Sequence, residues 1–155
     1  MHTAPNPQRS LSDLTEYSHR GLDCVNRMGN PGGNGFITIF EGAAGFAALQ
    51  RKDYGGARSY YRAALENAPS DLENVYQFAT ANLSPTPPNS VEGLFYLARA
   101  VILADKDSSV QIAIEKYALK KYRAYHGSDE GWDSVLNTAR QNSKPPAGFT
   151  ISKSS

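Results

Sequence analysis

The chain has 155 residues, of which 40% are apolar and 20% are charged, and 16 basic residues against 15 acidic ones give a formal net charge of +1. This length suits one domain, and the apolar fraction can supply a core, which excludes a wholly disordered chain. The near-neutral charge argues against a protein that binds nucleic acid by bulk attraction. A single cysteine, Cys24, excludes an intramolecular disulfide and a cysteine-based zinc site.

The start of the chain and its hydropathy pattern give expectations about the cellular compartment of the protein. No stretch approaches the roughly 18 consecutive apolar residues of a membrane span. The start of the chain, Met1–Gln8, lacks the apolar core of a secretory signal. Taken literally, the sequence indicates a cytoplasmic chain. A leader trimmed from the start would leave the compartment undetermined, and sparse cysteine also fits an exported protein without disulfides.

The first part of the chain reads as a lead-in and one helix. Residues 1–9 are predicted to be a disordered lead-in, and Ser10–Asp13 looks like a helix cap. Apolar residues at helical spacing then predict an N-terminal helix over residues 10–28, with Cys24 as an apolar filler. The Gly-rich segment 29–35 lacks the Lys-Ser/Thr pair and the preceding strand of a phosphate loop, so we interpret it as a loop.

The next blocks are helical apart from one ambiguity. Residues 36–40 are β-branched and aromatic, which suits a strand, whereas residues 42–50 are Ala-rich, which suits a closely packed helix. Residues 54–67 carry an apolar stripe at helical spacing, and Ser70 or Asp71 can cap the helix that follows Pro69.

The rest of the chain adds further helices and a tail. Periodicity predicts helices over residues 72–83 and 91–104. A C-terminal helical cap is expected over residues 109–142, with Ser108 or Ser109 as its first cap, Gly127 as a helix stop and Ser128 as the cap of its last helix. The tail, 143–155, is rich in Pro and Ser and carries no signals of order. About seven helices and no confident strand follow.

Residues 36–69 match a repeat unit of about 34 residues in two antiparallel helices. With Asp53-Tyr54 at the turn, small residues fall at the helix contacts, a large aromatic residue lies between them and a proline closes the unit: Gly45, Ala57 and Ala64, then Tyr61, then Pro69. Small residues are needed where two helix backbones approach. Glu41 and Ala48 depart from the pattern, because large aromatic residues are usual there. A degenerate second unit follows up to residue 104, with a longer turn over residues 84–89.

On these residues the chain resembles tetratricopeptide-repeat proteins, over roughly residues 36–151. Four stretches look like those of uncharacterised bacterial proteins with this repeat: IFEGAAGFAALQRKDY, NVYQFATANLSPTPPNSVEGLFYLARA, KKYRAYHGSDEGWDSVL and PPAGFTI. The resemblance implies an all-α solenoid of antiparallel helical hairpins, with two repeat pairs over residues 36–104 and a helical cap behind them. Similar proteins often begin with an export signal, so the resemblance also allows a periplasmic or secreted protein.

The family resemblance further implies a partner-binding groove. In such repeats the first helix of each pair lines a concave surface, and the matching positions here are Phe46, Leu49, Gln50, Glu73, Tyr76 and Thr80. Phe46 and Tyr76 would be aromatic anchors, unless they are core residues. Ala43 and Gln77 stand where a carboxylate clamp needs asparagine, so binding of acidic C-terminal peptides is not expected.

The segment Lys116–Trp132 has three interpretations. Lys116, Lys120, Arg123 and His126 could form a basic patch for nucleic acid or a small anion. His126 with Asp129 or Glu130 could act as a general base or hold a metal. We favour a structural role, in which the basic residues suit the negative end of the helix and His126 and Trp132 pack the corner between the last two helices.

The sequence therefore predicts an all-α protein that acts as a non-catalytic protein–protein interaction module, an adaptor or an assembly subunit. The partner would be another protein or a second copy of the chain. No cofactor, metal site or catalytic residue is expected, and binding of nucleic acid or a small anion through residues 116–126 is the alternative.

Overall fold

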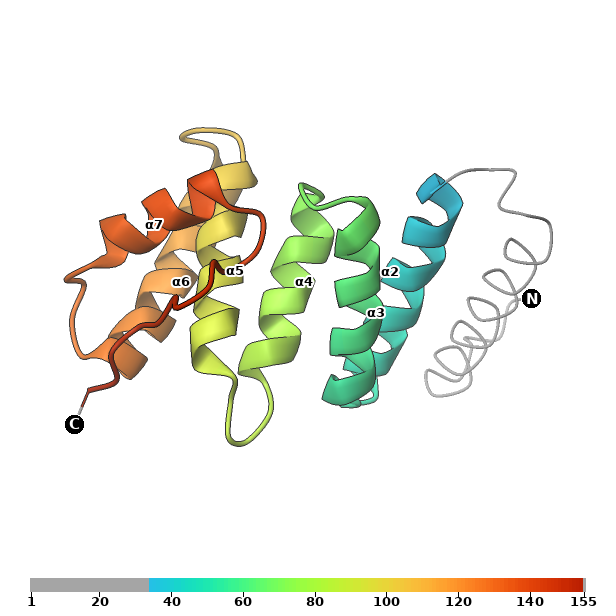
Figure 1. Cartoon of the computed structure of the whole chain (residues 1–155), viewed down its shortest axis with the longest axis horizontal. Helices are drawn as coiled ribbons and strands as arrows, with labels where there is room; N and C mark the ends of the chain where they lie inside the picture. Colours follow the sequence, from blue (N-terminus) through green and yellow to red (C-terminus); the bar gives the residue numbers. More distant parts are fainter. Residues whose placement is uncertain (1–33, 155) are drawn as a thin grey trace, which may run out of the picture. The chain divides into compact units, whose positions relative to one another are not determined.

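The computed structural model describes residues 34–154, and in that range the chain forms six helices and no strand (Figure 1). The all-α prediction is confirmed. The lead-in, the helix predicted over residues 10–28 and Cys24 lie outside the described residues, as does the Gly-rich loop except for its last two positions. Contacts divide the chain between residues 69 and 70 into two compact units, which are described separately below.

The first unit contains a helical hairpin of α2 (Asn34–Gln50) and α3 (Tyr54–Asn67). The ambiguity over residues 36–40 is resolved as helix, because these residues continue the helix whose Ala-rich part packs on α3. Lys52 makes the tight turn with a left-handed φ of 62°. Asp53 then caps α3, since its carboxylate accepts a hydrogen bond of 3.0 Å from the backbone N–H of Gly56.

Small side chains allow α2 and α3 to approach closely. Ala44, Ala47, Ala48, Ala57 and Ala64 have no exposed surface, and Tyr61 is 1% exposed. A Cβ atom at Gly45 would lie 2.9 Å from two ring atoms of Tyr61, so the ring packs directly on the glycine backbone. Ala48, which departs from the repeat pattern, is nevertheless a fully buried contact.

Glu41 on α2 is a partly buried carboxyl group facing α3. Its Oε2 atom has no hydrogen-bond partner among the described residues. Burial raises the pKa of Glu41 above its ordinary value of 4.5, and a hydrogen bond with the Asn67 side chain lowers it by less. The folded chain holds the Glu41 proton more tightly than the unfolded chain does, so the protonated group stabilises the fold below about pH 4.5. This stabilisation is lost as the pH rises through the higher pKa of the folded chain.

We expect Glu41→Gln to stabilise the first unit at pH 7 and to have almost no effect at pH 4. The glutamine stays neutral at both values, so it removes the cost of ionising a partly buried group. Solvent screening keeps the expected gain below about 1 kcal/mol. Urea unfolding of both chains at the two pH values measures it, and an equal change at pH 4 and pH 7 would contradict the assignment to ionisation.

The second unit begins with α4 (Leu72–Leu83) and α5 (Ser90–Leu103). Asp71, rather than Ser70, caps α4 by accepting a 2.9 Å hydrogen bond from the N–H of Asn74. The two helices are antiparallel, with the rings of Phe78 and Tyr96 edge to face at 4.7 Å between centroids. α5 is the central helix of this unit, since every residue from 93 to 101 is buried.

Arg99 is the buried cation of α5. Its Nη1 atom donates to the carbonyl oxygen of Ala139 at 3.0 Å, and its Nη2 atom donates to Oγ of Ser70 at 3.1 Å. Burial lowers the pKa of this guanidinium from its ordinary value. The side chain thus joins three segments of the second unit, a role that the sequence analysis did not anticipate.

The unit continues with α6 (Ser109–His126) and α7 (Trp132–Gln141). Ser108 caps α6, and Gly127 ends it with the left-handed φ of 100° expected of a stop glycine. The prediction that Ser128 caps the last helix is wrong. α7 begins only after Gly131, whose φ is 86°, and Ser128 instead accepts a hydrogen bond of 3.3 Å from the N–H of Glu130. The longer turn lets Trp132 reach the ring of Tyr122.

The tail packs back onto the helices, although the sequence shows no order signals there. The ring of Phe149 meets the ring of Phe95 on α5 at 5.3 Å between centroids, and Ile151 is only 6% exposed. The N–H of Ser154 donates to the carbonyl oxygen of Tyr125 at 2.8 Å. Two apolar side chains therefore hold the segment against the core of the second unit. No helix within residues 34–154 is long and apolar enough to cross a membrane.

Candidate functional site

One predicted groove residue of α2, Phe46, belongs to an exposed apolar stripe on that helix. Phe46 is 40% exposed and Ile39 is 65% exposed. They are two helical turns apart, so both lie on one face of α2, and we call this pair the α2 stripe. Leu49 is half-buried and Gln50 is exposed. Phe46 is thus not a core residue of its unit. The sequence analysis missed Ile39, because it falls in the stretch with the strand-like pattern.

A small apolar pocket lies between α4 and α6. It has a volume of about 210 Å³ and is lined by Leu72, Glu73, Tyr76, Val110 and Ile114. We call it the α4–α6 pocket. Val110 is 53% exposed at its edge. Two of the predicted groove residues, Glu73 and Tyr76, therefore line this pocket together with two residues of α6, Val110 and Ile114. Apolar spacing alone does not indicate whether such residues are exposed.

The remaining contacts of the α4–α6 pocket are local. The rings of Tyr76 and Tyr117 lie 6.4 Å apart, and burial together with Tyr76 raises the pKa of Tyr117. Glu73 accepts a hydrogen bond of 3.0 Å from the Gln77 side chain. Thr80, one turn further along α4, donates its hydroxyl to the carbonyl oxygen of Tyr76 at 3.1 Å. Tyr76 therefore packs against Tyr117 and also lines the pocket.

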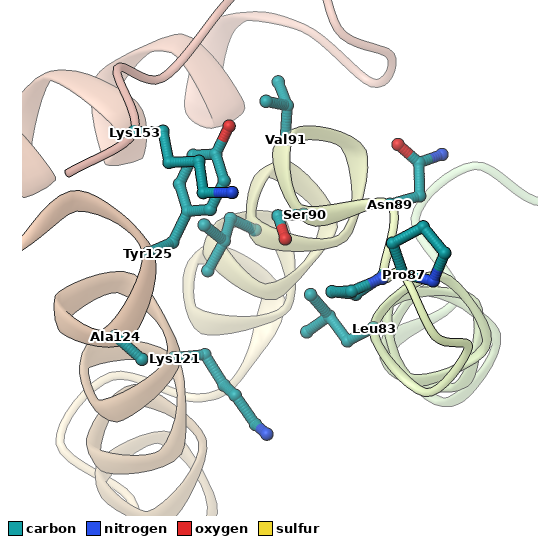
Figure 2. A pocket seen from close by; sticks show the side chains of 11 residues that line it. Leu83, Pro87, Asn89, Ser90, Val91, Lys121, Ala124, Tyr125 and Lys153 are labelled. Carbon is teal, nitrogen blue, oxygen red and sulfur yellow. The ribbon is translucent and has the colours of Figure 1, made fainter. Parts of the chain in front are cut away.

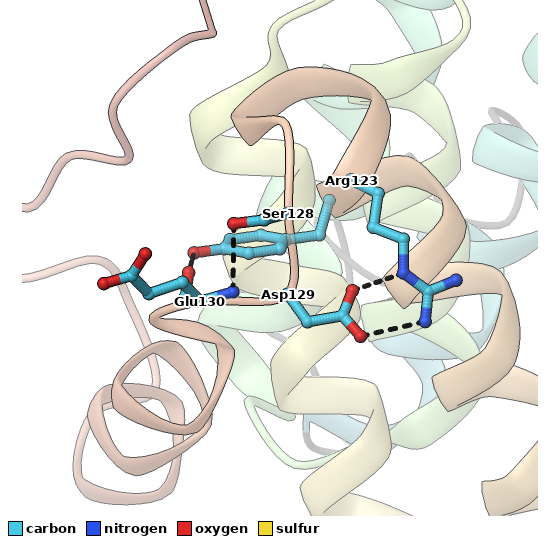
Figure 3. A network of polar contacts seen from close by, with 5 residues as sticks. Arg123, Ser128, Asp129 and Glu130 are labelled. Atoms are coloured by element: carbon cyan, nitrogen blue, oxygen red, sulfur yellow. Dashed lines mark hydrogen bonds and ion pairs between the residues drawn. The ribbon is translucent and has the colours of Figure 1, made fainter.

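The predicted basic patch does not act as one free cationic surface. Lys116 and Lys120 are exposed, but Arg123 forms a two-pronged ion pair with Asp129 (Figure 3). Its Nη2 atom lies 3.0 Å from Oδ2 of Asp129. This pairing lowers the pKa of the Asp129 carboxyl group and raises that of Arg123. Because Asp129 neutralises Arg123, the patch loses one of its expected charges.

His126 does not pair with Asp129, as a general base would require. Its Nδ1 atom lies 2.9 Å from the carbonyl oxygen of Ser152 and 3.1 Å from Oγ of the same residue. His126 and Glu130 do line a common open pocket of about 600 Å³, bounded by α6, α7 and the tail. Among residues 34–154, no group of three His, Cys, Asp or Glu side chains could hold a metal ion.

Instead, Tyr122 organises the corner between α6 and α7. Its ring lies 5.1 Å from that of His126 and 5.3 Å from that of Trp132. Its hydroxyl donates to the carbonyl oxygen of Glu130 at 2.6 Å, a contact drawn in Figure 3. Burial raises the pKa of the Tyr122 hydroxyl, as do the carboxylates of Glu130 and Asp129. These contacts agree with the structural interpretation of the segment.

Comparison with known proteins adds no relative: the chain matches no protein-family description, no curated protein and no solved structure.

Proposed function

We propose that this chain is a tetratricopeptide-like protein that binds a protein partner and performs no catalysis. The partner is engaged through the α4–α6 pocket of the second unit. The observation that carries the proposal is the apolar α4–α6 pocket with its half-exposed rim residue Val110. Apolar side chains left open at the surface in this way are typical of sites that a partner covers.

The helix arrangement supports the repeat assignment. Each expected repeat corresponds to an antiparallel hairpin, α2–α3 and α4–α5, and each hairpin has a glycine at a close helix contact. A Cβ at Gly93 would lie 2.6 Å from Cγ of Leu83, as one at Gly45 would meet Tyr61. In addition, α4 and α6 run in the same direction and are connected through the antiparallel α5 (Figure 1). Parallel alternate helices are the arrangement of a helical solenoid.

The alternative, binding of nucleic acid through residues 116–126, has less support. Arg123 is paired with Asp129, and His126 is engaged by Ser152, so Lys116 and Lys120 are the exposed cations that remain of the four predicted patch residues. Together with the half-buried Lys121, three lysines provide few phosphate contacts.

Photocrosslinking from α6 tests the proposal. A photoreactive phenylalanine analogue is placed at Val110 or, as the matched control, at Ile112, which is 62% exposed on the opposite side of the same helix. We expect irradiation of cells to link one defined protein to position 110 and not to position 112. Analytical ultracentrifugation shows whether that protein is a second copy of the chain.

The affinity for the captured protein then follows with purified chains. Val110→Asp should weaken binding about tenfold or more, whereas Ile112→Asp should leave it unchanged. The aspartate at position 110 stands in the first turn of α6, where a negative charge suits the helix dipole, so the fold is preserved. Equal crosslinking from positions 110 and 112, or equal affinity of the two aspartate variants for the partner, would refute binding at the α4–α6 pocket.

A further inference from the structure

A separate, larger pocket opens at the first turn of α5 (Figure 2). Its volume is about 550 Å³, within the range of small-molecule sites. It lies within the second unit, and residues from α4, the α4–α5 loop, α5, α6 and the tail line it. Segments that are far apart in the sequence thus converge on one open cavity. This cavity shares no lining residue with the proposed partner-binding pocket.

The pocket has one apolar side and one cationic side. Leu83 and Pro87 lie on the α4 side, Ser90 lies at the centre, and Tyr125 and Lys153 lie on the side of α6 and the tail (Figure 2). Lys121 of α6 borders the same side, with its Nζ atom 5.6 Å from the centre of the Tyr117 ring. Apolar walls with a few polar groups on one side are the usual lining of a site for an amphipathic small molecule.

The charge of this pocket is unbalanced. Two lysines line it and no carboxylate does. Neither lysine forms an ion pair with a carboxylate in residues 34–154. The acidic residue of the first turn of α5, Glu92, accepts a hydrogen bond of 2.8 Å from the Asn89 side chain and does not line the pocket. The lining therefore carries a net positive charge, with the Lys121 ammonium over the Tyr117 ring, and this charge favours an anionic guest.

The start of α5 adds to this preference. Asn89 stands at the N-cap position, but its side chain does not cap the helix. It donates instead to Oδ1 of Asn82 at 3.0 Å and to Glu92. Ser90 and Val91, the first residues of α5, line the pocket. The positive end of the helix dipole therefore faces the cavity and strengthens the attraction that the lysines provide.

We propose that this pocket binds a small monocarboxylate with an apolar body, such as a medium-chain aliphatic acid. Lys153 and the Tyr125 hydroxyl hold the carboxylate, and Leu83, Pro87 and Leu94 contact the apolar part. Lys121 adds positive charge at the edge of the cavity. A phosphate would leave the apolar walls unused and find no arginine fork.

This site differs from the basic patch that the sequence predicted. Lys116 and Lys120 are exposed on α6 and do not line the pocket. Lys121 and Tyr125 are one turn apart and do line it, and Lys153 comes from the tail. Sequence spacing could not have paired Lys153 with Lys121, because the folding back of the tail brings them to the same cavity.

NMR titration of the ¹⁵N-labelled full chain tests the proposal with four probes: octanoate, octanamide, benzoate and inorganic phosphate. We expect octanoate to shift the amide signals of Ser90, Val91, Lys121 and Lys153 with a dissociation constant near or below about 1 mM. Lys153→Gln should weaken octanoate about fivefold, which is typical for loss of one charged hydrogen bond. Lys121→Gln should weaken it by less, because this charge acts on the carboxylate from a greater distance. Lys120→Gln, an identical change on the neighbouring exposed position, should leave it unchanged.

Four other outcomes would overturn the proposal. Equal affinity for octanamide would show an apolar pocket that does not recognise charge. Binding of phosphate without octanoate would assign a different ligand class. Equal loss in Lys120→Gln would mean general attraction to a basic surface, and shifts confined to other residues would place the carboxylate elsewhere. Benzoate tests the shape of the apolar body, and binding of it at this pocket supports the same class of ligand.

Discussion

Replacing Phe149 and Ile151 together by alanine is expected to lower the free energy of unfolding of the second unit by about 3–5 kcal/mol. Ile151 is 6% exposed, and the Phe149 ring packs edge to face on the fully buried Phe95. Removing both side chains leaves a cavity beside α5 and releases the segment that places Lys153. Urea unfolding followed by the fluorescence of Trp132, the chain's one tryptophan, measures this loss, because Trp132 is buried in the same unit.

Thr150→Ala is the matched control for this prediction. Thr150 lies between the two apolar residues and is exposed. Its replacement should change the free energy of unfolding by less than about 0.5 kcal/mol. If the double variant were as stable as Thr150→Ala, the tail would contribute nothing to the fold, and the packing of Phe149 on Phe95 would not hold in solution.

Gly45→Val is expected to destabilise the α2–α3 hairpin by about 2–3 kcal/mol. The first added atom would already lie 2.9 Å from the Tyr61 ring, and this ring is 1% exposed and so has no room to move away. The helices must separate to admit the side chain, which opens the contacts of the buried alanines around it. The better helix propensity of valine offsets only a small part of this cost.

Gly55→Val is the control, because nothing lies within 4 Å of a Cβ at Gly55. This residue is also helical and lies in the same unit, so the same substitution should be neutral or stabilising by a few tenths of a kcal/mol. Hydrogen exchange of peptides from α2 and α3 compares the two variants. Similar protection in both would mean that the helices do not touch at Gly45, which would also remove one support for the repeat assignment.

The Gly45 contact and the tail contact bear on different proposals. The Gly45 contact belongs to the helix spacing that the repeat pattern requires. The tail contact bears on the pocket at α5, since the packing of residues 149–151 helps to place Lys153 in the lining of that pocket. A tail that detaches should therefore weaken octanoate binding without affecting photocrosslinking from position 110.

Local features of this protein follow from the order of its amino acids. Helical spacing and the stop at Gly127 depend on residues within one or two turns of each other, so the sequence predicts them directly. For the same reason it narrows the caps of α4 and α6 to two neighbouring residues each, and the structure selects Asp71 and Ser108. The close contact at Gly45 was predictable for a related reason, because a small residue and a large aromatic one at repeat spacing indicate two helix backbones in close approach.

Contacts between distant segments, in contrast, depend on the fold. Arg123 is a possible member of a basic patch in the sequence, but the turn after α6 brings Asp129 against it. Val110 continues the apolar spacing of α6, yet its side chain is 53% exposed. The tail carries no periodicity, yet Phe149 and Ile151 are ordered by the core they contact rather than by local preference. The burial of a side chain depends on the surfaces that the fold brings to it, and neither spacing nor propensity encodes those surfaces.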